Sequence, residues 1–199
     1  MRTIVVATQN AGKVVEIKKM LKDLNVEVKT MSELGIDIEI EESGITFEEN
    51  AILKAEALKK YTDAIILADD SGLEIDFLNK KPGVYSARYL GKNTSYTVKN
   101  QIILDKLKDV PREKRTARFV CAMAVASQGM PTLTTLGTIE GYIGYEARGT
   151  NGFGYDPIFF VEEYNTSTAD MCEDLKNKIS HRGNALKQMK ERLNGILEE

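Results

Sequence analysis

The sequence has little histidine, little cysteine and no tryptophan. The single histidine, His181, excludes zinc sites built on several imidazoles, such as HExxH, and is the only imidazole available for a Ser/His or Cys/His pair. Cys121 and Cys172 lie far apart and no CxxC occurs, so we expect neither a disulfide scaffold nor a thiolate zinc site. Any metal must therefore be held by carboxylate oxygens.

The chain also lacks a long apolar run and an excess of positive charge. Its longest clean apolar stretch, residues 119–126, is much shorter than the roughly 18 residues that cross a bilayer, and a strand-like run follows Met1 and Arg2 almost at once. We therefore expect neither a membrane span nor a signal peptide, and the sparse, widely separated cysteines make a reducing cytoplasm the expected location. The net charge of −3 does not favour a nucleic-acid partner, so an anionic ligand would require locally concentrated positive charge.

What is present indicates one folded domain over residues 1–199, since 42% of the residues are hydrophobic and 29% charged. Apolar, β-branched runs alternate with helical periodicity along the first half, and an antiparallel-looking strand pair follows. This order predicts an α/β fold on a mixed sheet. The expected strands cover residues 3–7, 26–31, 64–68, 117–126, 132–139 and 158–161, and the expected helices begin near Val14, after Thr46, at Ser95 and after Ser180.

The polar segment from Thr8 to Lys13 follows the first strand and opens a helix. Its hydroxyl, amide and backbone N–H groups suit an anion such as phosphate. It is not a Walker A loop, because Ala7 replaces the first glycine and Val14 replaces the Ser/Thr that would hold magnesium. An ordinary polar turn with Lys13 in solvent is the alternative interpretation.

Asp69, Asp70, Ser71 and Gly72 directly follow an apolar strand, where we expect the strand to end in a polar loop. Two carboxylates about 4 Å apart would repel by about 4 kcal/mol at an effective dielectric constant near 20. A magnesium ion would turn this repulsion into attraction, with Glu41 or Glu42 as a further oxygen ligand. The alternative is an aspartate that caps a turn.

Two later segments offer groups for a ring-shaped ligand. Phe153 lies between Gly152 and Gly154, which would let a base approach the backbone closely, although an irregular structural loop is an equal alternative. Lys176, His181 and Arg182 bring several hydrogen-bond donors to a helix start, which fits recognition of ring carbonyl oxygens. Neither a serine triad nor a zinc deaminase is expected, because GxSxG, H-x-E and PCxxC are all missing.

Six motifs, taken in order, strongly resemble the inosine triphosphate pyrophosphatase family, also called dITP/XTP pyrophosphatases. The resemblance runs from residue 3 to about 195, and six motifs in the same order are far more specific than one. The motifs are Thr8-Gln9-Asn10-Ala11-Gly12-Lys13, Thr46-Phe47-Glu48-Glu49-Asn50-Ala51, Asp69-Asp70-Ser71-Gly72-Leu73, Pro82-Gly83-Val84-Tyr85-Ser86-Ala87-Arg88-Tyr89, Gly152-Phe153-Gly154-Tyr155-Asp156-Pro157 and Ser180-His181-Arg182.

The resemblance implies a long mixed sheet flanked by helices, with two lobes and an active-site cleft between them. It implies a cytoplasmic homodimer that uses Mg²⁺ to hydrolyse non-standard purine nucleoside triphosphates (ITP, dITP and XTP) to the monophosphate and pyrophosphate. Glu42 and Asp70 are similar to the metal ligands, and Asp70 to the proton acceptor, while Lys13 and Lys54 would hold phosphates. The substrate-binding positions implied are Thr8, Gln9, Asn10, Ala11, Gly12, Lys13, Ser71, Phe153, Gly154, Tyr155, Asp156, Lys176, His181 and Arg182.

Two other functions stay open at this stage. A house-cleaning pyrophosphatase for modified pyrimidines would share the metal chemistry but prefer dUTP-like substrates, and a non-catalytic nucleotide-binding protein would release no pyrophosphate. The donors Lys176, His181 and Arg182 would match the 6-oxo group of hypoxanthine and xanthine and mismatch the 6-amino group of adenine. How guanine would be rejected does not follow from the sequence.

Overall fold

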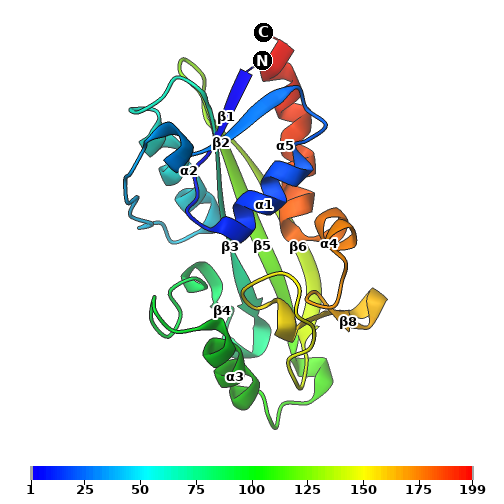
Figure 1. The fold of residues 1–199 in the computed structure, drawn as a ribbon. Helices are drawn as coiled ribbons and strands as arrows, with labels where there is room; N and C mark the ends of the chain where they lie inside the picture. The colour runs from blue at the N-terminus through cyan, green and yellow to red at the C-terminus, as the bar shows by residue number, and fades with distance from the viewer. Residues whose placement is uncertain (1, 199) are drawn as a thin grey trace. The chain divides into compact units, whose positions relative to one another are not determined.

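The computed structural model describes residues 2–198 and has a mixed eight-stranded sheet flanked by helices (Figure 1). The strand order is β2-β1-β3-β5-β6-β7-β8, and β4 pairs with β3. The strands are β1 (Arg2–Val6), β2 (Val26–Thr30), β3 (Ile65–Ile75), β4 (Lys81–Pro82), β5 (Thr116–Ala126), β6 (Leu133–Ile143), β7 (Phe159–Val161) and β8 (Thr166–Ser167). The helices are α1 (Ala11–Met20), α2 (Phe47–Leu58), α3 (Tyr96–Lys106), α4 (Glu173–Ile179) and α5 (His181–Glu198).

The sheet contains both parallel and antiparallel strand pairs, which confirms the predicted α/β fold on a mixed sheet. β1 runs parallel to β2 and to β3, whereas β4, β7 and β8 each pair antiparallel with a neighbour. Among residues 2–198, no helix combines the length and the apolar composition that crossing a membrane requires.

The chain divides into two compact units, and β3, β5 and β6 contribute residues to both. The first unit comprises residues 2–70, 121–137 and 181–198, and the second comprises residues 71–120 and 138–180. The sequence predictions of a single domain and of a cleft between two lobes stay predictions.

In the first unit, β1 and β3 are buried on both faces, as their continuous apolar runs predict. Alternate side chains such as Ile4, Val6 and Leu67 form one core with apolar residues of α1 and α5. Their neighbours in sequence, including Val5 and Ile66, point to the opposite face and are also fully buried. The start of β1 and the end of α5 lie close together (Figure 1), and Arg2 donates to the carbonyl of Ile196.

Helix α2 begins where its sequence predicts. The side chain of Thr46 accepts from the backbone N–H of Glu49, and the Glu49 side chain accepts from the N–H of Thr46, which confirms the capping box. Ala51, Ala55 and Leu58 are fully buried and form the apolar stripe.

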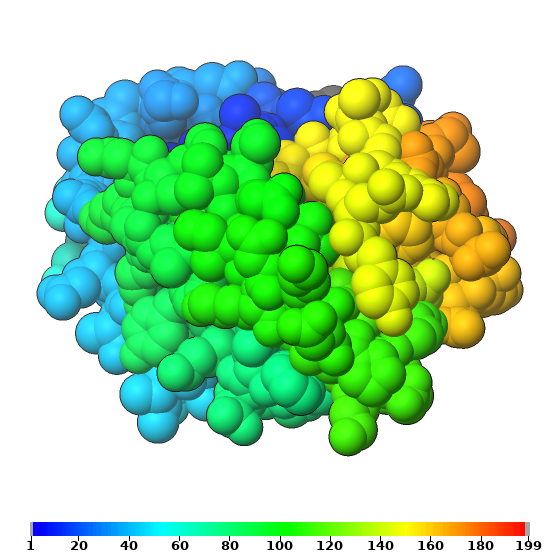
Figure 2. All heavy atoms as spheres, turned by 90° about the horizontal axis from the view of Figure 1, so that it is seen from below, coloured from blue at the N-terminus to red at the C-terminus, as the bar shows by residue number. Residues whose placement is uncertain are grey.

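The second unit has its own apolar core, which α3 and the later parts of β3 and β6 share. Leu73, Ile103, Ile143 and Phe159 are fully buried in this core. Figure 2 views this unit from the side of α3, where the green spheres of residues near 80–110 lie beside the yellow spheres of residues near 145–155.

One expectation about β3 is wrong. The strand does not end before Asp69, but continues through Asp69, Asp70, Ser71 and Gly72 to Ile75. Aspartate and glycine are depleted in strands, which is why the sequence predicts a loop here. The reason for the difference is that each carboxylate meets cations inside the first unit, as described next.

Candidate active site

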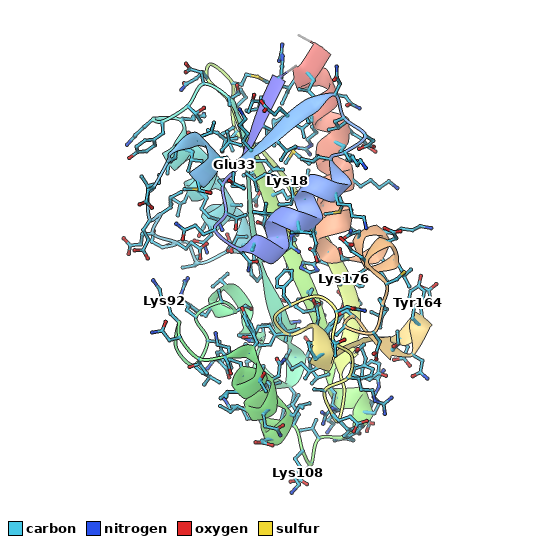
Figure 3. All side chains as sticks on the ribbon, in the orientation of Figure 1. Lys18, Glu33, Lys92, Lys108, Tyr164 and Lys176 are labelled. Atoms are coloured by element: carbon cyan, nitrogen blue, oxygen red, sulfur yellow. The ribbon has the colours of Figure 1, made fainter. Side chains whose placement is uncertain are left out.

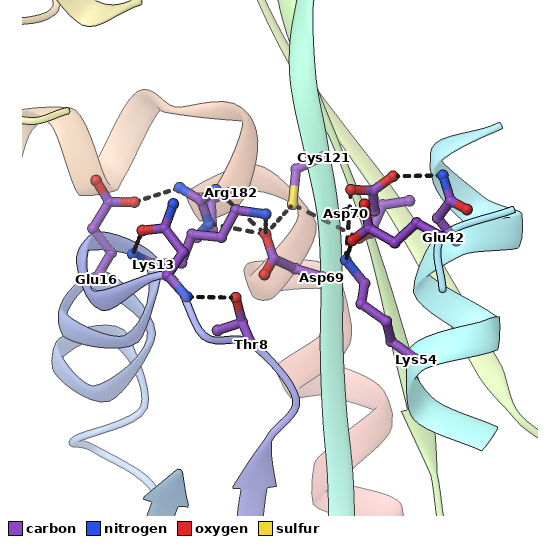
Figure 4. A network of polar contacts seen from close by, with 12 residues as sticks. Thr8, Lys13, Glu16, Glu42, Lys54, Asp69, Asp70, Cys121 and Arg182 are labelled. Atoms are coloured by element: carbon purple, nitrogen blue, oxygen red, sulfur yellow. Dashed lines mark hydrogen bonds and ion pairs between the residues drawn. The ribbon is translucent and has the colours of Figure 1, made fainter. Parts of the chain in front are cut away.

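Asp69 and Asp70 are adjacent in β3 and therefore point to opposite faces of the sheet. In Figure 4 they lie on opposite sides of the β3 ribbon, Asp69 toward Lys13 and Arg182, Asp70 toward Lys54. Both are buried, with 0% and 5% of their surface exposed. The repulsion expected for two carboxylates on one side of a loop is thereby relieved, and each carboxylate has a separate set of partners.

On the α2 face, Asp70 is surrounded by one amide, one ammonium and one further carboxylate. Asn50 Nδ2 donates to Asp70 Oδ2 at 3.1 Å, and the Lys54 Nζ lies 3.5 Å from Asp70 Oδ1. Lys54 also donates to Glu42 Oε1 at 2.7 Å. Because Asn50 and Lys54 are four residues apart, α2 presents them side by side.

The pKa shifts on this face follow from burial and from the neighbouring charges. Burial raises the pKa of the Asp70 carboxyl above its ordinary value; Lys54 and Lys13 oppose that shift and Glu42 adds to it. Burial alone would lower the pKa of Lys54, but Asp70, Asp69 and Glu42 outweigh it and raise that pKa. Glu42 and Asp70 thus both contact the same Lys54 ammonium, an arrangement of carboxylate oxygens that attracts cations.

The structure separates the two glutamates that the sequence left as alternatives. Glu42 contacts Lys54 and acts electrostatically on Asp70. Glu41 is exposed and lines a surface groove with Lys60 and Tyr61. Within residues 2–198, no group of three or more His, Cys, Asp or Glu side chains could hold a metal ion. The pair Glu42 and Asp70 still suits Mg²⁺, which commonly binds one or two carboxylates and takes water and phosphate oxygens as its other ligands.

On the opposite face, Asp69 belongs to a buried cluster with Lys13, Glu16 and Arg182. Lys13 Nζ lies 2.9 Å and Arg182 Nη2 3.3 Å from Asp69 Oδ2, and Arg182 Nη1 also pairs with Glu16. Burial alone would raise the pKa of Asp69, but the positive charges of Lys13, Arg182 and Lys54 lower it well below its ordinary value. Two cations and two carboxylates make this cluster electrically balanced.

The segment from Thr8 to Lys13 joins β1 to the N-terminus of α1. Thr8 Oγ1 accepts from the backbone N–H of Asn10, and Asn10 caps the helix by accepting from the N–H of Lys13 at 3.2 Å. Gln9 and Ala11 are exposed, and Thr8 and Gly12 half-buried, so the first turn of α1 is accessible. First-turn N–H groups have no partner within a helix and favour anions.

In the second unit, Asp156 organises the loop from Gly152 to Pro157. Its Oδ2 accepts from the Phe153 N–H at 2.8 Å and from Lys176 Nζ at 2.7 Å, and its Oδ1 accepts from Thr168 Oγ1 at 2.9 Å. Lys176 Nζ lies 4.9 Å from the centre of the half-buried Phe153 ring. A polar pair and an aromatic face thus lie together, as recognition of a flat heterocycle requires.

The other predicted residues occupy different surroundings. Tyr155 is buried in the core of the second unit and donates through its hydroxyl to the carbonyl of Ser86 at 2.8 Å. Ser71 is half-buried in β3. His181 and Arg182 begin α5 and belong to the first unit, whereas Lys176 belongs to the second, so one shared donor cluster stays a prediction.

Sequence reasoning missed two residues that contact predicted ones, Glu16 and Thr168, and assigned no site role to Asn50, although Asn50 belongs to one of the six motifs. Glu16 follows Lys13 by three residues, so helical spacing could have indicated it. No local pattern indicates Thr168, because its hydrogen bond to Asp156 forms only when the folded chain brings these two residues together.

A family model described as the Ham1 family matches residues 4–192. The chain belongs to the Ham1 family. The family membership that the motifs predict is thereby confirmed. The dITP/XTP pyrophosphatase of Bacillus subtilis strain 168 is 50% identical over 95% of this chain and 96% of its own. The dITP/XTP pyrophosphatase of Clostridium perfringens strain 13 is 45% identical over 99% of this chain and 100% of its own.

Solved structures of the Ham1 family have the same fold. The Ham1 protein of Coxiella burnetii superposes with a TM-score of 0.88 at 42% identity, covering 98% of this chain and 100% of that one. The Staphylococcus aureus Ham1 protein superposes with a TM-score of 0.87 at 42% identity, covering 98% of this chain and 99% of that one.

Proposed function

We propose that this protein is a nucleoside triphosphate pyrophosphatase that hydrolyses non-standard purine nucleoside triphosphates, with dITP, ITP and XTP as substrates. The reaction would yield the nucleoside monophosphate and pyrophosphate. The observation that carries this proposal is the arrangement around β3, where Asp70, Glu42 and Lys54 meet on one face and Asp69 and Lys13 meet on the other. The chain is also 50% identical to a dITP/XTP pyrophosphatase.

We further propose that Glu42 and Asp70 hold Mg²⁺. The Lys54 ammonium already contacts both carboxylates, so the donor set accepts a cation at this position. When bound, Mg²⁺ would neutralise phosphate charge and stabilise the leaving pyrophosphate. Asn50 would keep Asp70 oriented by its hydrogen bond to Oδ2.

The chain's own residues would then do the rest. Lys13 and Lys54 would neutralise the triphosphate, and the accessible first turn of α1 would offer backbone N–H groups to phosphate oxygens. Asp70 would orient a water for in-line attack on the α-phosphorus and accept its proton. Its raised pKa moves it toward the range in which a carboxylate is an effective base. Positioning and charge stabilisation dominate such phosphoryl chemistry.

For the base, we propose that Phe153 stacks on the ring while Lys176 and Asp156 bind its polar edge. The 6-oxo group of hypoxanthine or xanthine would accept from Lys176, whereas the 6-amino group of adenine would face the same ammonium as a second donor. A site built on such buried polar groups can discriminate by about 10⁴.

One assay tests the proposal: pyrophosphate release from ITP, dITP, XTP, GTP, ATP and dUTP, with Mg²⁺ and with a chelator. We expect release from the first three substrates, and only with Mg²⁺. Equal activity on ATP, a preference for dUTP, or activity that survives the chelator would each overturn it. Nucleotide binding without pyrophosphate release would instead indicate a binding protein.

A homodimer and a cytoplasmic location complete the proposal. Light scattering after size-exclusion chromatography should give twice the 22.2 kDa chain mass. A single chain mass at micromolar concentration would exclude the stable dimer without affecting the proposed chemistry.

A further inference from the structure

The motif from Pro82 to Tyr89 has no role in the chemistry proposed above, yet in the second unit it is tied to the loop that carries Phe153 and Asp156. Ser86 accepts from the Tyr155 hydroxyl at 2.8 Å. Helix α3 contacts both segments: Lys99 Nζ donates to the carbonyl of Ala87 at 2.7 Å, and Asn100 Nδ2 donates to the carbonyl of Gly154 at 3.1 Å. Two adjacent helical residues thus hold two separate loops.

Lys99 is an unusual residue for a buried position. It is 1% exposed, and in the part of the chain that the structure describes its ammonium has no carboxylate partner. It meets the Ala87 carbonyl and, at 4.8 Å, the centre of the Tyr96 ring. Lysine is almost never fully buried unless it is paired, and burial lowers the pKa of this one. A methionine would fill the same space without the desolvation cost.

Asn100 is unusual in the same way. It is 5% exposed, and its Oδ1 is buried without a hydrogen-bond partner among residues 2–198. The bond to Gly154 fixes the orientation of the amide, because the flipped side chain would place two oxygens against each other. A half-satisfied buried amide requires an explanation, and such exceptions concentrate at functional sites.

The loop that these residues hold needs support from outside. Gly152 and Gly154 have φ values of +72° and +70°, a region that glycine enters freely, so the loop backbone is intrinsically permissive. The Tyr155 ring packs edge-on against Tyr96 at 5.1 Å, one turn of α3 before Lys99 and Asn100. Tyr96 and Asn100 therefore contact the loop directly, and Lys99 beside them on α3 contacts the Ala87 segment to which the loop is tied.

We propose that Lys99 and Asn100 are positioning residues for substrate selection, which fix the Phe153–Asp156 loop in the geometry that binds the purine. This inference rests on the proposed function. Neither residue would touch the substrate; Asn100 acts through the Gly154 carbonyl, and Lys99 through the Ala87 carbonyl and the Ser86–Tyr155 contact. Their loss should therefore weaken base recognition while leaving the Asp70 chemistry intact.

The test compares Lys99→Met and Asn100→Leu with two controls on or just after the same helix. Gln101→Leu removes an exposed amide that donates to Asp105, and Lys108→Met removes an exposed ammonium (Figure 3). For each positioning variant we expect the KM for ITP to rise about tenfold with kcat within about twofold, and the preference for ITP over ATP to fall by a similar factor. Lys99→Arg, which retains donors, should recover most of the difference.

A merely structural role gives a different result. Partial unfolding lowers the active fraction and hence kcat while KM stays unchanged, and urea titration measures the folded fraction directly. Hydrogen exchange adds a readout independent of turnover: the Phe153 amide, bonded to Asp156, should exchange faster in both positioning variants than in the controls. Unchanged KM, or equal effects in the controls, would overturn the inference.

The failure of the inference and that of the proposed function are distinguishable. If the wild-type protein releases no pyrophosphate from any purine triphosphate, the proposed function fails. If the wild type is active and selective and the variants match it in KM, in selectivity and in exchange of the Phe153 amide, only the positioning role fails.

Discussion

Replacing Arg182 with methionine should destabilise the first unit far more than breaking a surface ion pair. Arg182, Glu16 and Asp69 are 1%, 7% and 0% exposed, and with Lys13 they form a cluster of two positive and two negative charges. Removing the guanidinium leaves two buried carboxylates against one ammonium. Breaking a buried pair in this way costs about 3–5 kcal/mol. For a chain of this size, a loss of that order lowers Tm by about 6–20 °C.

A double variant separates charge imbalance from lost packing. Glu16→Leu combined with Arg182→Met removes one charge of each sign and leaves the Lys13–Asp69 pair at 2.9 Å balanced. It should therefore lose much less stability than the sum of the two single variants, with a coupling energy of about 2 kcal/mol or more. The measurements are urea titration and thermal unfolding by circular dichroism.

The matched control is Lys18→Met, which breaks the pair with Glu33 at 3.1 Å on the surface of the same unit (Figure 3). Both side chains are more than a third exposed, and such pairs contribute about 1 kcal/mol or less. A loss of stability in Arg182→Met no larger than in this control would show that charge imbalance does not destabilise the cluster. A double variant that loses the full sum of the two single losses would show the same.

Four further changes have defined outcomes. Asp70→Asn should cut kcat for ITP by about 10²–10⁴ with little change in nucleotide affinity by calorimetry, and near-normal turnover would remove Asp70 from the base and metal roles. Gly152→Ala would place a Cβ 2.2 Å from Asp156 Oδ2 at a φ of +72°, so the KM for ITP should rise by about 10²; an unchanged KM would separate this carboxylate from base recognition. Thr46→Ala removes the side-chain cap of α2 and should lower the free energy of unfolding, measured by urea titration, by about 1 kcal/mol; an unchanged free energy of unfolding would show that the cap does not stabilise the helix. Because the folded pKa of Asp69 is lowered, its stabilisation is present above about pH 4 and lost as the pH falls further, so wild-type stability should fall more steeply below pH 4 than that of Asp69→Asn; parallel curves would contradict this.

Local signals in the sequence predict α1, α2, α3 and α5 and most of the longer strands, whereas they do not predict α4 or the two-residue strands β4 and β8. The Thr46 capping box, the Ser95 cap of α3 and the continuous apolar run of β1 each depend on residues within one or two turns. The path of β3 through Asp69 and Asp70 depends instead on cations from α1, α2 and α5, far away in the chain. No local preference could predict that these tertiary ion pairs override the low strand propensity of aspartate.

The candidate site divides in the same way. Motif order indicates Lys13, Lys54 and Asp70, and the structure brings each of them to β3. That Asp69 and Asp70 serve different faces follows only from the strand, because a loop carries no alternation. Glu16 pairs with Arg182, which lies 166 positions away in the sequence. Such a pair is the hardest to predict, because only the tertiary packing of α1 against α5 brings the two side chains together.

The alternation of β3 makes its alignment with β1 a determinant of charge placement. Ile4, Val5 and Val6 pair with Ile65, Ile66 and Leu67, only two residues before the first aspartate. A shift of β3 by one position would turn every side chain to the other face and would deliver Asp70 to Lys13 and Asp69 to Lys54. A single-residue insertion or deletion between Leu67 and Asp69 would thus exchange the two charge clusters while leaving the composition of the site unchanged. The apolar pairs at the start of β3 fix the strand register, and this register determines which face each carboxylate occupies.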